Sequence, residues 1–338
     1  MPAKLTLEEI LEIGLSYTRC KTLLSAVELG VFTELAKQPL EYEALRQRLG
    51  LHPRGARDFF DALVAMGLLE RDGDKYRNTD VTDLYLDRAK PTYAGGMLEM
   101  ANDRLYHSWG RLTEALKTGR PQSEIKETGG DFFQTIYQDP DRLRQFLKAM
   151  TASGHETAKS LARQFPWKRY RTLVDIGTAE GDLPVQVARV HPHITGGGFD
   201  LPVVQPIFEE YVRKFNLQER LKFYPGDFFT DPLPPADVIC MGRILHDWDL
   251  EQKRFLLRKA YDALPSGGAV IIIETIIDDE RRTHVSGLLN SLNMLLETEG
   301  GFDYTSAECM SWMHDVGFTD TYIEPLASHR SMVVGLKP

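Results

Sequence analysis

Residues 173–181, Leu-Val-Asp-Ile-Gly-Thr-Ala-Glu-Gly, constrain the fold more than any other stretch of the chain. The apolar start of this stretch, which contains Asp175, predicts a buried parallel strand. Gly177 and Gly181 then permit a tight turn and a close approach of the backbone to a ligand before a helix begins. The spacing matches neither the Gly-x-Gly-x-x-Gly dinucleotide fingerprint nor a phosphate-binding P-loop. Taken alone, the stretch predicts a strand, a glycine turn and a helix, with or without a nucleotide-like ligand.

Strand-like and helix-like segments alternate through the rest of the second half of the chain. Further strands are predicted at 194–200, 221–224, 236–241 and 269–274. Helices are predicted at 183–190, 204–215, 250–264 and 306–316. This alternation predicts an α/β fold, in which helices cover both faces of a parallel sheet and ligands bind at the carboxyl ends of its strands. The segments 319–326 and 332–336 are expected to add an antiparallel pair.

Three acidic residues lie where a nucleoside cofactor would be held. Asp200 ends the second strand about twenty residues after the glycine turn, the usual place for a carboxylate that binds ribose hydroxyls. Asp227 follows the third strand beside Phe228, and Asp175 lies at the turn itself. Any one acid could instead be a surface or helix-capping residue. Because carboxylates would repel a pyrophosphate, the three together favour a cationic, phosphate-free nucleoside, S-adenosylmethionine.

Composition excludes several classes of protein. The chain has 338 residues and a formal net charge of −9, which argues against a protein that binds nucleic acid through phosphate contacts. Cys20, Cys240 and Cys309 show neither metal-ligand spacing nor a disulfide framework, so a reducing compartment is expected. The N-terminus has no apolar signal core and the longest apolar run, 269–273, is strand-sized. A cytoplasmic protein without a membrane span is therefore expected.

The first half predicts two helical regions of different character. In the first region, helical spacing at 7–35, 42–49 and 54–66 precedes two short strands that turn at Asp72-Gly73, which is a winged-helix pattern. A winged helix can bind DNA, but here acidic residues outnumber basic ones and the helix at 54–66 is apolar, which favours dimerisation. The following aromatic- and methionine-rich helices are expected to form core and to line a small-molecule cavity. Three parts are thus predicted: a dimerisation domain (1–90), a connecting region that contributes to the substrate pocket (91–168) and a cofactor-binding catalytic domain (169–338).

Several stretches resemble one family, the S-adenosylmethionine-dependent small-molecule O-methyltransferases of the caffeic-acid and hydroxyindole types. They are the glycine turn, Phe-Asp-Leu-Pro (199–202), Gly-Asp-Phe-Phe (226–229), Arg-Ile-Leu-His-Asp-Trp (243–248), Pro-Ser-Gly-Gly (265–268), Ile-Ile-Glu (272–274) and the segment 291–301. The resemblance implies a Rossmann-like, doubly wound class I methyltransferase domain and an N-terminal, mostly α winged-helix domain that forms a homodimer. It also implies methyl transfer to a hydroxyl of a small aromatic or polyketide-like metabolite in secondary metabolism.

The resemblance also implies roles for individual residues. The implied cofactor contacts are Asp175, Gly177, Asp200, Leu201, Gly226, Asp227, Phe228, Arg243 and Tyr137. The implied general base is His246, flanked by the acids Glu274 and Asp303, and the implied substrate contacts are Asn293 and Met294. The product would be S-adenosylhomocysteine, and the partners a hydroxylated acceptor and a second copy of the chain. Metal, nucleic acid and membrane are not implied.

Three positions depart from the pattern of the family. Gly177-Thr178-Ala179 replaces the usual run of three glycines, and is expected to narrow the methionine end of the cofactor site. Asp303 stands where a longer Glu is common, which shortens its reach toward His246. Gly154 stands where the hydroxyindole branch has Trp, which is expected to enlarge or reshape the pocket.

The implied site has a simple chemistry. A phenol has a pKa near ~10, and a neutral histidine of pKa ~6.5 can accept its proton as the methyl group is transferred. A carboxylate on the other ring nitrogen would stabilise the imidazolium that forms. His246 could instead be a residue at the start of a helix capped by Asp247 or Asp249, and Glu274 and Asp303 could make structural hydrogen bonds. The competing functions are methyl transfer to N, C or S, a cofactor-bound relative that no longer methylates, and a DNA-binding regulator.

Overall fold

The computed structural model describes residues 5–90, 92–123, 137 and 139–338. Contacts divide the chain into two compact units, Met1–His107 and Ser108–Pro338. The predicted boundaries at residues 90 and 168 stay a prediction. None of the helices in the described ranges is both long and apolar enough to cross a membrane.

The first unit contains the predicted winged-helix elements. Its helices are α1 (Leu7–Glu28), α2 (Val31–Lys37), α3 (Tyr42–Arg48), α4 (Pro53–Ala65), α5 (Asp80–Leu86) and α6 (Gly96–Met100), followed by a π-helical turn (Ala101–Leu105) and α7 (Tyr106–Trp109), which runs into the second unit. The helical spacing predicted over 7–35 is interrupted at Gly30, whose φ of 72° separates α1 from α2. The apolar face of α4 packs inward, with Phe60 5.5 Å from Tyr76 between ring centroids.

The hairpin of the first unit differs from the prediction in two details. β2 (Leu69–Asp72) and β3 (Lys75–Asn78) pair with Asp72 opposite Lys75, so the two-residue loop is Gly73-Asp74 and not Asp72-Gly73. Gly73 supplies the positive φ, 61°, that such a loop requires. A two-residue strand, β1 (Leu40–Glu41), pairs with β3 and was not predicted, because so short a strand carries no periodic signal.

The second unit is built on a seven-stranded sheet in its described part, with the order β6-β5-β4-β7-β8-β10-β9. The strands are β4 (Thr172–Ile176), β5 (Thr195–Asp200), β6 (Leu221–Pro225), β7 (Val238–Gly242), β8 (Ala269–Glu274), β9 (Thr319–Pro325) and β10 (Ser331–Leu336). β4 to β8 are parallel, and β10 runs antiparallel to both β8 and β9. The predicted parallel sheet with a closing antiparallel pair is confirmed.

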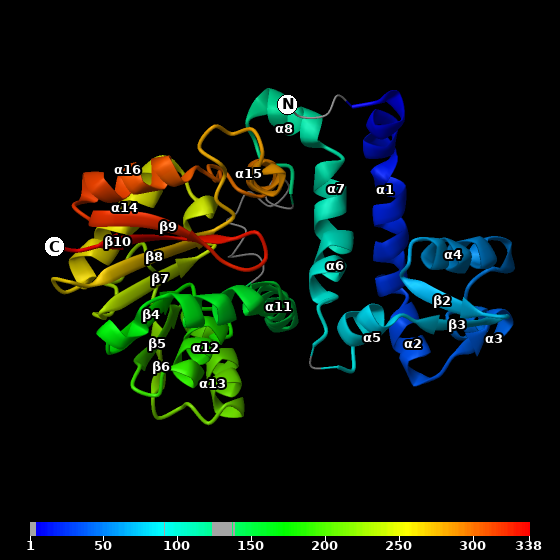
Figure 1. Ribbon diagram of the computed structural model, residues 1–338, viewed down its shortest axis with the longest axis horizontal. Helices are drawn as coiled ribbons and strands as arrows, with labels where there is room; N and C mark the ends of the chain where they lie inside the picture. The colour runs from blue at the N-terminus through cyan, green and yellow to red at the C-terminus, as the bar shows by residue number, and fades with distance from the viewer. Residues whose placement is uncertain (1–4, 91, 124–136, 138) are drawn as a thin grey trace. The chain divides into compact units, whose positions relative to one another are not determined.

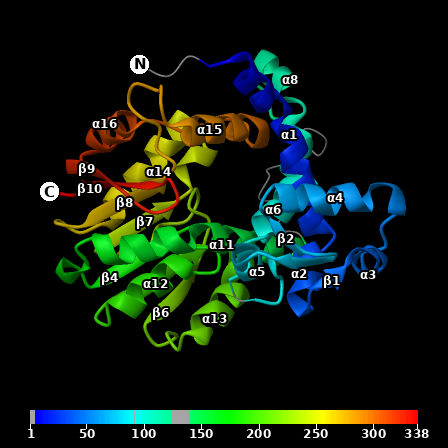
Figure 2. The same ribbon diagram turned by 45° about the vertical axis from the view of Figure 1, so that its right-hand side comes forward.

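The described α-helices of the second unit, besides the end of α7, are α8 (Leu112–Thr118), α11 (Pro140–Gln164), α12 (Asp182–Val190), α13 (Gln205–Lys214), α14 (Leu250–Ala263), α15 (Val285–Glu297) and α16 (Ser306–Val316). Some of them cover the two faces of the sheet. Figure 1 and Figure 2 show α12 and α13 on one side of the sheet and α14 and α16 on the other.

The two faces of the sheet belong to separate apolar cores. In β4, Val174 packs with residues of α14 and α16, whereas its neighbour Leu173 packs with residues of α11 and α12. Both faces of the strand are therefore buried, which explains its continuous apolar sequence. The carboxyl ends of the parallel strands remain as the edge at which polar side chains gather.

Candidate active site

The carboxyl ends of four parallel strands carry most of the predicted site residues. Asp175 lies within β4, Asp200 ends β5, Arg243 follows β7, and Glu274 ends β8. Because these strands are parallel, their carboxyl ends lie at the same edge of the sheet, and these side chains lie along that edge. The fold thus brings these predicted residues together at one edge of the sheet, and their roles stay a prediction.

The glycine turn after β4 is tightly packed. Gly177 has a φ of 65°, and a Cβ at this position would lie 2.3 Å from Ile244 Cδ1, so only glycine fits. The neighbouring Thr178 is buried, and its hydroxyl donates a 2.9 Å hydrogen bond to Asp175 Oδ2. Its methyl group occupies the space over Gly198 of β5, where a Cβ would come within 2.2 Å of Thr178 Cγ2. The threonine in place of a family glycine is therefore accommodated by a glycine on the next strand.

Two buried carboxyl groups face this turn. Asp200 accepts the backbone N–H groups of Ala179 at 2.9 Å and Leu201 at 2.8 Å. Burial raises the pKa of Asp200 to about 6, although these two N–H bonds work in the opposite direction. Burial also raises the pKa of Asp175 to about 7, against the hydrogen bond from Thr178. Burial therefore disfavours the ionised form of both carboxyl groups in the free protein. A ligand that donates hydrogen bonds to them would stabilise this ionised form.

The end of β6 forms an aromatic wall. Gly226 is buried, and a Cβ there would lie 2.7 Å from the ring of Phe199. Asp227 accepts the backbone N–H of Phe229 at 2.8 Å. Phe228 makes edge-on ring contacts, with centroids 4.9 Å from Phe229 and 5.8 Å from Trp248.

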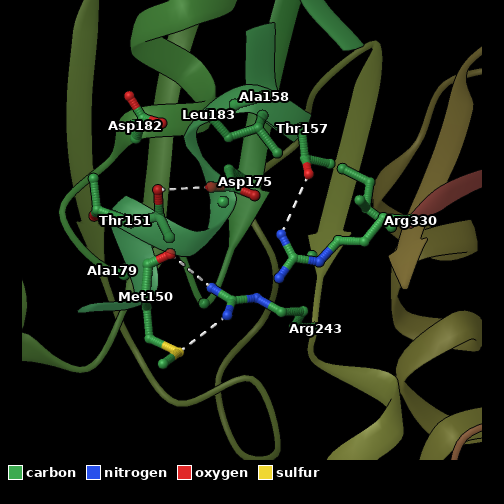
Figure 3. A pocket seen from close by; sticks show the side chains of 15 residues that line it. Met150, Thr151, Thr157, Ala158, Asp175, Ala179, Asp182, Leu183, Arg243 and Arg330 are labelled. Carbon is green, nitrogen blue, oxygen red and sulfur yellow. Dashed lines mark hydrogen bonds between the residues drawn. The ribbon is translucent and has the colours of Figure 1, made fainter. Parts of the chain in front are cut away.

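A pocket lies between the glycine turn and α11 (Figure 3). Of the predicted cofactor contacts, it is lined by Asp175, Gly177 and Arg243, whereas Asp200, Leu201, Gly226, Asp227, Phe228 and Tyr137 are not part of its lining. Tyr137 instead packs in an apolar cluster with Leu143, Leu147, Val204 and Ile207. Gly154 of α11 lines the pocket, so its missing side chain does bear on the shape of this pocket.

Arg243 is held in the pocket by neutral acceptors. Its backbone has a φ of 57°, and its N–H donates to Ile273 of β8 at 3.0 Å. Its guanidinium group donates to the carbonyl oxygen of Met150 at 3.0 Å, to the sulfur of Met150 at 3.1 Å and to Ser153 Oγ at 2.9 Å. Burial, together with the nearby charge of Arg330, lowers the pKa of Arg243 to about 10. A backbone in this left-handed conformation is strained for a non-glycine residue, and such strain is concentrated at functional sites.

His246 lies against two buried carboxyl groups. Its Nδ1 is 3.4 Å from Asp303 Oδ1 and 3.6 Å from Glu274 Oε2. Both oxygens are buried and accept no hydrogen bond from any residue in the described ranges. The backbone N–H of His246 donates to the other oxygen of Glu274 at 3.3 Å. Asp303 thus comes within ion-pair distance of His246 despite being shorter than the usual Glu, and both carboxylates favour a proton on Nδ1.

Asn290 belongs to the same group and was not predicted. Its Nδ2 donates to Asp303 Oδ2 at 2.7 Å and lies 3.2 Å from His246 Nδ1. Asn290 is on α15, one helical turn before Asn293 and Met294. The spacing of two asparagines three residues apart is the signal that could have found it, but no helix was predicted there.

The two predicted substrate residues of α15 have different surroundings. Asn293 accepts a 3.0 Å hydrogen bond from the indole N–H of Trp109. Met294 is buried in the body of the unit.

The charges around His246 are strongly coupled. Burial by itself would lower the pKa of His246, but Glu274, Asp247 and Asp303 raise it to about 10. Burial raises the pKa of Glu274 to about 7, and burial also raises the pKa of Asp247, whose Oδ1 lies 3.5 Å from His246 Nε2. Two further cations act on these carboxyl groups: Lys253, whose pKa burial lowers to about 8, and Arg243, whose charge lowers the pKa of Asp247. The arrangement can accept, hold and release a proton.

The same three residues also satisfy the spacing of a metal site. Ligand atoms of His246, Glu274 and Asp303 lie within 4.8 Å of one another. The amide of Asn290 directs its N–H toward this group, however, and a hydrogen-bond donor beside the ligand atoms disfavours a cation there.

S-adenosylmethionine fits the polar groups on this edge of the sheet. Its ribose hydroxyls and amino group need acceptors, which Asp200 and Asp175 provide. Its carboxylate needs buried donors, which Arg243 provides, and Arg330 adds a buried Nε that has no acceptor among the described residues. Its adenine needs an apolar surface with a hydrogen-bond acceptor, as Phe228 and Asp227 offer.

Comparisons with known proteins identify the family. Residues 109–319 match the family model of an O-methyltransferase domain, and residues 11–88 match that of an O-methyltransferase dimerisation domain. The chain is 45% identical to the tetracenomycin polyketide synthesis 8-O-methyl transferase TcmO of Streptomyces glaucescens, over 98% of this chain and 96% of that protein. It is 37% identical to the N,N-dimethyltransferase OxyT of Streptomyces rimosus, over 97% and 96% of the two chains.

A solved structure extends the likeness to the whole fold. The crystal structure of human N-acetylserotonin methyltransferase in complex with SAM matches with a TM-score of 0.89 and 29% identity, over 100% of this chain and 99% of that one. The chain belongs to the S-adenosylmethionine-dependent O-methyltransferase family, with a dimerisation domain in its first unit and a class I methyltransferase fold in its second.

Proposed function

We propose that this enzyme methylates a phenolic hydroxyl of an aromatic, polyketide-like metabolite, with His246 as the general base. The observation that carries the proposal is the placement of His246 Nδ1 within 3.6 Å of two buried carboxylate oxygens that have no other donor among the described residues. The carboxylates raise the pKa of His246 to about 10, so the neutral ring that acts as a base becomes the main form only at alkaline pH. In this neutral form the proton stays on Nδ1, and the lone pair of Nε2 accepts the proton of the acceptor hydroxyl.

In this proposal, one set of residues binds the cofactor and a second set transfers the proton. Asp200 binds the ribose hydroxyls, Asp227 and Phe228 bind the adenine, and Asp175, Gly177 and Arg243 bind the methionine end. When bound, S-adenosylmethionine supplies a methyl group that its sulfonium has already activated. His246 accepts the hydroxyl proton at Nε2, and Glu274 and Asp303 stabilise the imidazolium that results. Asn290 holds Asp303 in place through its 2.7 Å hydrogen bond.

The acceptor class is supported by the relatives. TcmO is named for O-methylation in the synthesis of a polyketide, and it is 45% identical to this chain along nearly its whole length. A polycyclic phenol is therefore the acceptor to try first.

The test is a methylation assay with a panel of hydroxylated polycyclic aromatics and matched aromatic amines. Mass spectrometry should detect a product heavier by one methyl group on a phenol, together with S-adenosylhomocysteine. Methylation of the amines alone would replace the proposal by N-methyl transfer, the activity in the name of the relative OxyT. Formation of no S-adenosylhomocysteine with any acceptor would favour the relative that no longer methylates.

We also propose that the enzyme is a homodimer held by its first unit. The dimerisation domain model covers residues 11–88. Helix α1 carries Leu7, Ile10, Leu11, Leu15 and Tyr17, each more than half exposed in a single chain. Apolar residues in such a row are typical of an interface. Light scattering after size exclusion should give twice the chain mass, and Leu11→Glu combined with Leu15→Glu should halve it; a wild-type protein of single-chain mass would refute the dimer.

A further inference from the structure

Arg330 enters the cofactor pocket from the turn between β9 and β10. Ser328 and His329, which precede it, both have left-handed backbones, with φ of 61° and 58°. The turn is closed by the N–H of Leu326, which donates to the carbonyl of Arg330 at 2.7 Å. It is fastened to α11 by Thr157, whose hydroxyl donates to the carbonyl of Ala327 at 3.2 Å. Two successive strained residues in a tied turn indicate that the position of Arg330 is specified by the fold.

Arg330 and Arg243 have the same kind of partners. Arg330 Nη1 donates to the carbonyl of Ser153 at 2.8 Å and to Thr157 Oγ1 at 3.3 Å, and its buried Nε has no acceptor among the described residues. Arg243 likewise contacts neutral acceptors on Met150 and Ser153. Of the ion pairs that join described residues, none includes either arginine. Figure 3 shows both guanidinium groups pointing into the pocket.

Two buried cations of like charge require an anion nearby. Each lowers the stability of the other's charged form, and buried charges in proteins are ordinarily paired. The carboxyl groups that line the pocket already have other partners. Asp175 accepts from Thr178, and Asp182 accepts from Gln186 and Tyr211 and contacts His155. Glu274, Asp247 and Asp175 act on Arg243 through space, and Glu274 acts on Arg330. No carboxylate of the described residues lies within ion-pair distance of either guanidinium group, so both are available to pair directly with an anionic group of a ligand.

We propose that Arg330, together with Arg243, binds the carboxylate at the methionine end of the cofactor. A planar guanidinium group matches the geometry of a carboxylate, and two of them can hold it from two sides. The pocket is bounded by the glycine turn at Gly177, which faces the same end of the cofactor. Gly154 lies between Ser153 and Thr157, the α11 partners of Arg330, and its lack of a side chain leaves this part of the pocket open to both arginines. The inference rests on the cofactor and is independent of the acceptor.

The test compares two ligands that differ at this end. S-adenosylhomocysteine carries the amino-acid carboxylate, whereas 5′-methylthioadenosine keeps the nucleoside and thioether but lacks it. Their affinities for the unliganded enzyme are measured by calorimetry for the wild type, Arg330→Met and Arg330→Lys. Arg330→Met should weaken S-adenosylhomocysteine binding about tenfold or more and 5′-methylthioadenosine binding less than about twofold. Arg330→Lys keeps the charge and should show a smaller loss for S-adenosylhomocysteine.

The matched control is Arg254→Met, because Arg254 is exposed and pairs with Asp315 on the surface. It should change neither affinity. Equal losses for both ligands in Arg330→Met would mean that the residue only supports the pocket, and would overturn the proposal. Unchanged affinity for S-adenosylhomocysteine, with a raised KM for an acidic acceptor, would assign Arg330 to the acceptor and would also overturn it. If Arg330→Met does not fold, as judged by circular dichroism, the same comparison with Arg330→Lys decides the matter.

Discussion

Two groups of buried charges lie on the same edge of the sheet and are balanced in different ways. Around His246, three carboxyl groups surround one imidazole, so the group contains its own counter-charges. In the pocket beside α11, Arg243 and Arg330 contact only neutral acceptors among the residues described. We call the first the acid cluster and the second the arginine pair.

The difference indicates different tasks. The acid cluster can change its charge by moving a proton, because the pKa values of its members are raised, to about 10 for His246 and about 7 for Glu274. The arginine pair does not release protons near neutral pH, and it forms no ion pair with a carboxylate of the described residues, so it is suited to binding an anionic group of a ligand. One group is suited to proton transfer, the other to anchoring a ligand. Each prediction below tests one side of this division.

The largest effect is expected for His246→Asn. Loss of the general base should lower kcat about a hundredfold or more, because positioned acid–base groups contribute of that order. The affinity for S-adenosylhomocysteine should stay within about twofold of the wild type, since His246 belongs to the acid cluster. Steady-state kinetics and calorimetry provide the two numbers. His314→Asn, at an exposed histidine of α16, is the control; a loss of less than tenfold in the His246 variant would refute the base role.

Glu274→Gln should have a smaller effect on kcat, of about tenfold, and should also move the pH profile. The carboxylate of Glu274 raises the pKa of His246, so its removal lowers that pKa. The basic form of His246 then appears at lower pH, and the rising limb of log kcat should shift toward acid by about one pH unit. A histidine of lower pKa is also a weaker base, so the maximal kcat reached at alkaline pH should fall as well. A series that extends above pH 10, past the pKa of His246, measures both the limb and the plateau, with the exposed Glu280→Gln as the matched control. A limb that does not move, or moves toward alkaline pH, would contradict the coupling.

On the side of the arginine pair, Asp175→Asn should change stability in a pH-dependent way. The folded protein raises the pKa of Asp175 from 3.8 to about 7, so the stability associated with this group is present below pH 4 and is lost as the pH rises through 7. Asparagine does not titrate, so the variant does not lose this stability as the pH rises. Its amide oxygen can still accept the hydrogen bond from the Thr178 hydroxyl. Its advantage in free energy of unfolding should grow by on the order of 2 kcal/mol between pH 5 and pH 8.

Urea titrations of the unliganded variant at the two pH values measure this change, with Asp315→Asn on the surface as the control. S-adenosylhomocysteine should bind the Asp175 variant more weakly, because the acceptor for the amino group of the ligand has lost its charge. An advantage that is the same at both pH values would show that Asp175 is not the group that titrates.

The smallest effect is expected from removal of metal ions. Dialysis against EDTA should leave kcat unchanged, because the acid cluster works with protons and not with a cation. The measurement matters because His246, Glu274 and Asp303 have a spacing that could hold a metal. Loss of activity that Mg²⁺ or Zn²⁺ restores would mean that the cluster is a metal site and would replace the general-base proposal.

Much of the architecture follows from local patterns in the sequence. The strand at 269–274 and the helix at 306–316 were predicted with the bounds that the structure has, because continuous apolar runs and helical periodicity depend on nearby residues alone. The glycine turn and the residues that end the strands could be placed for the same reason. His246, Glu274 and Asp303 were singled out by resemblance, and the fold brings them together.

The sequence alone therefore determined the alternation of strands and helices, the edge of the sheet where chemistry occurs and the family of the enzyme. Only the tertiary structure showed that Thr178 fits because Gly198 lies opposite, that Asn290 holds Asp303, and that Arg330 joins Arg243. The physical reason is distance along the chain. Arg330 and Arg243 lie in different connections, and no local periodicity reports that a turn before the last strand points into a pocket begun at β4. Which charged groups become neighbours depends on contacts between residues that are far apart in the chain, so the sequence alone does not show how these charges are balanced.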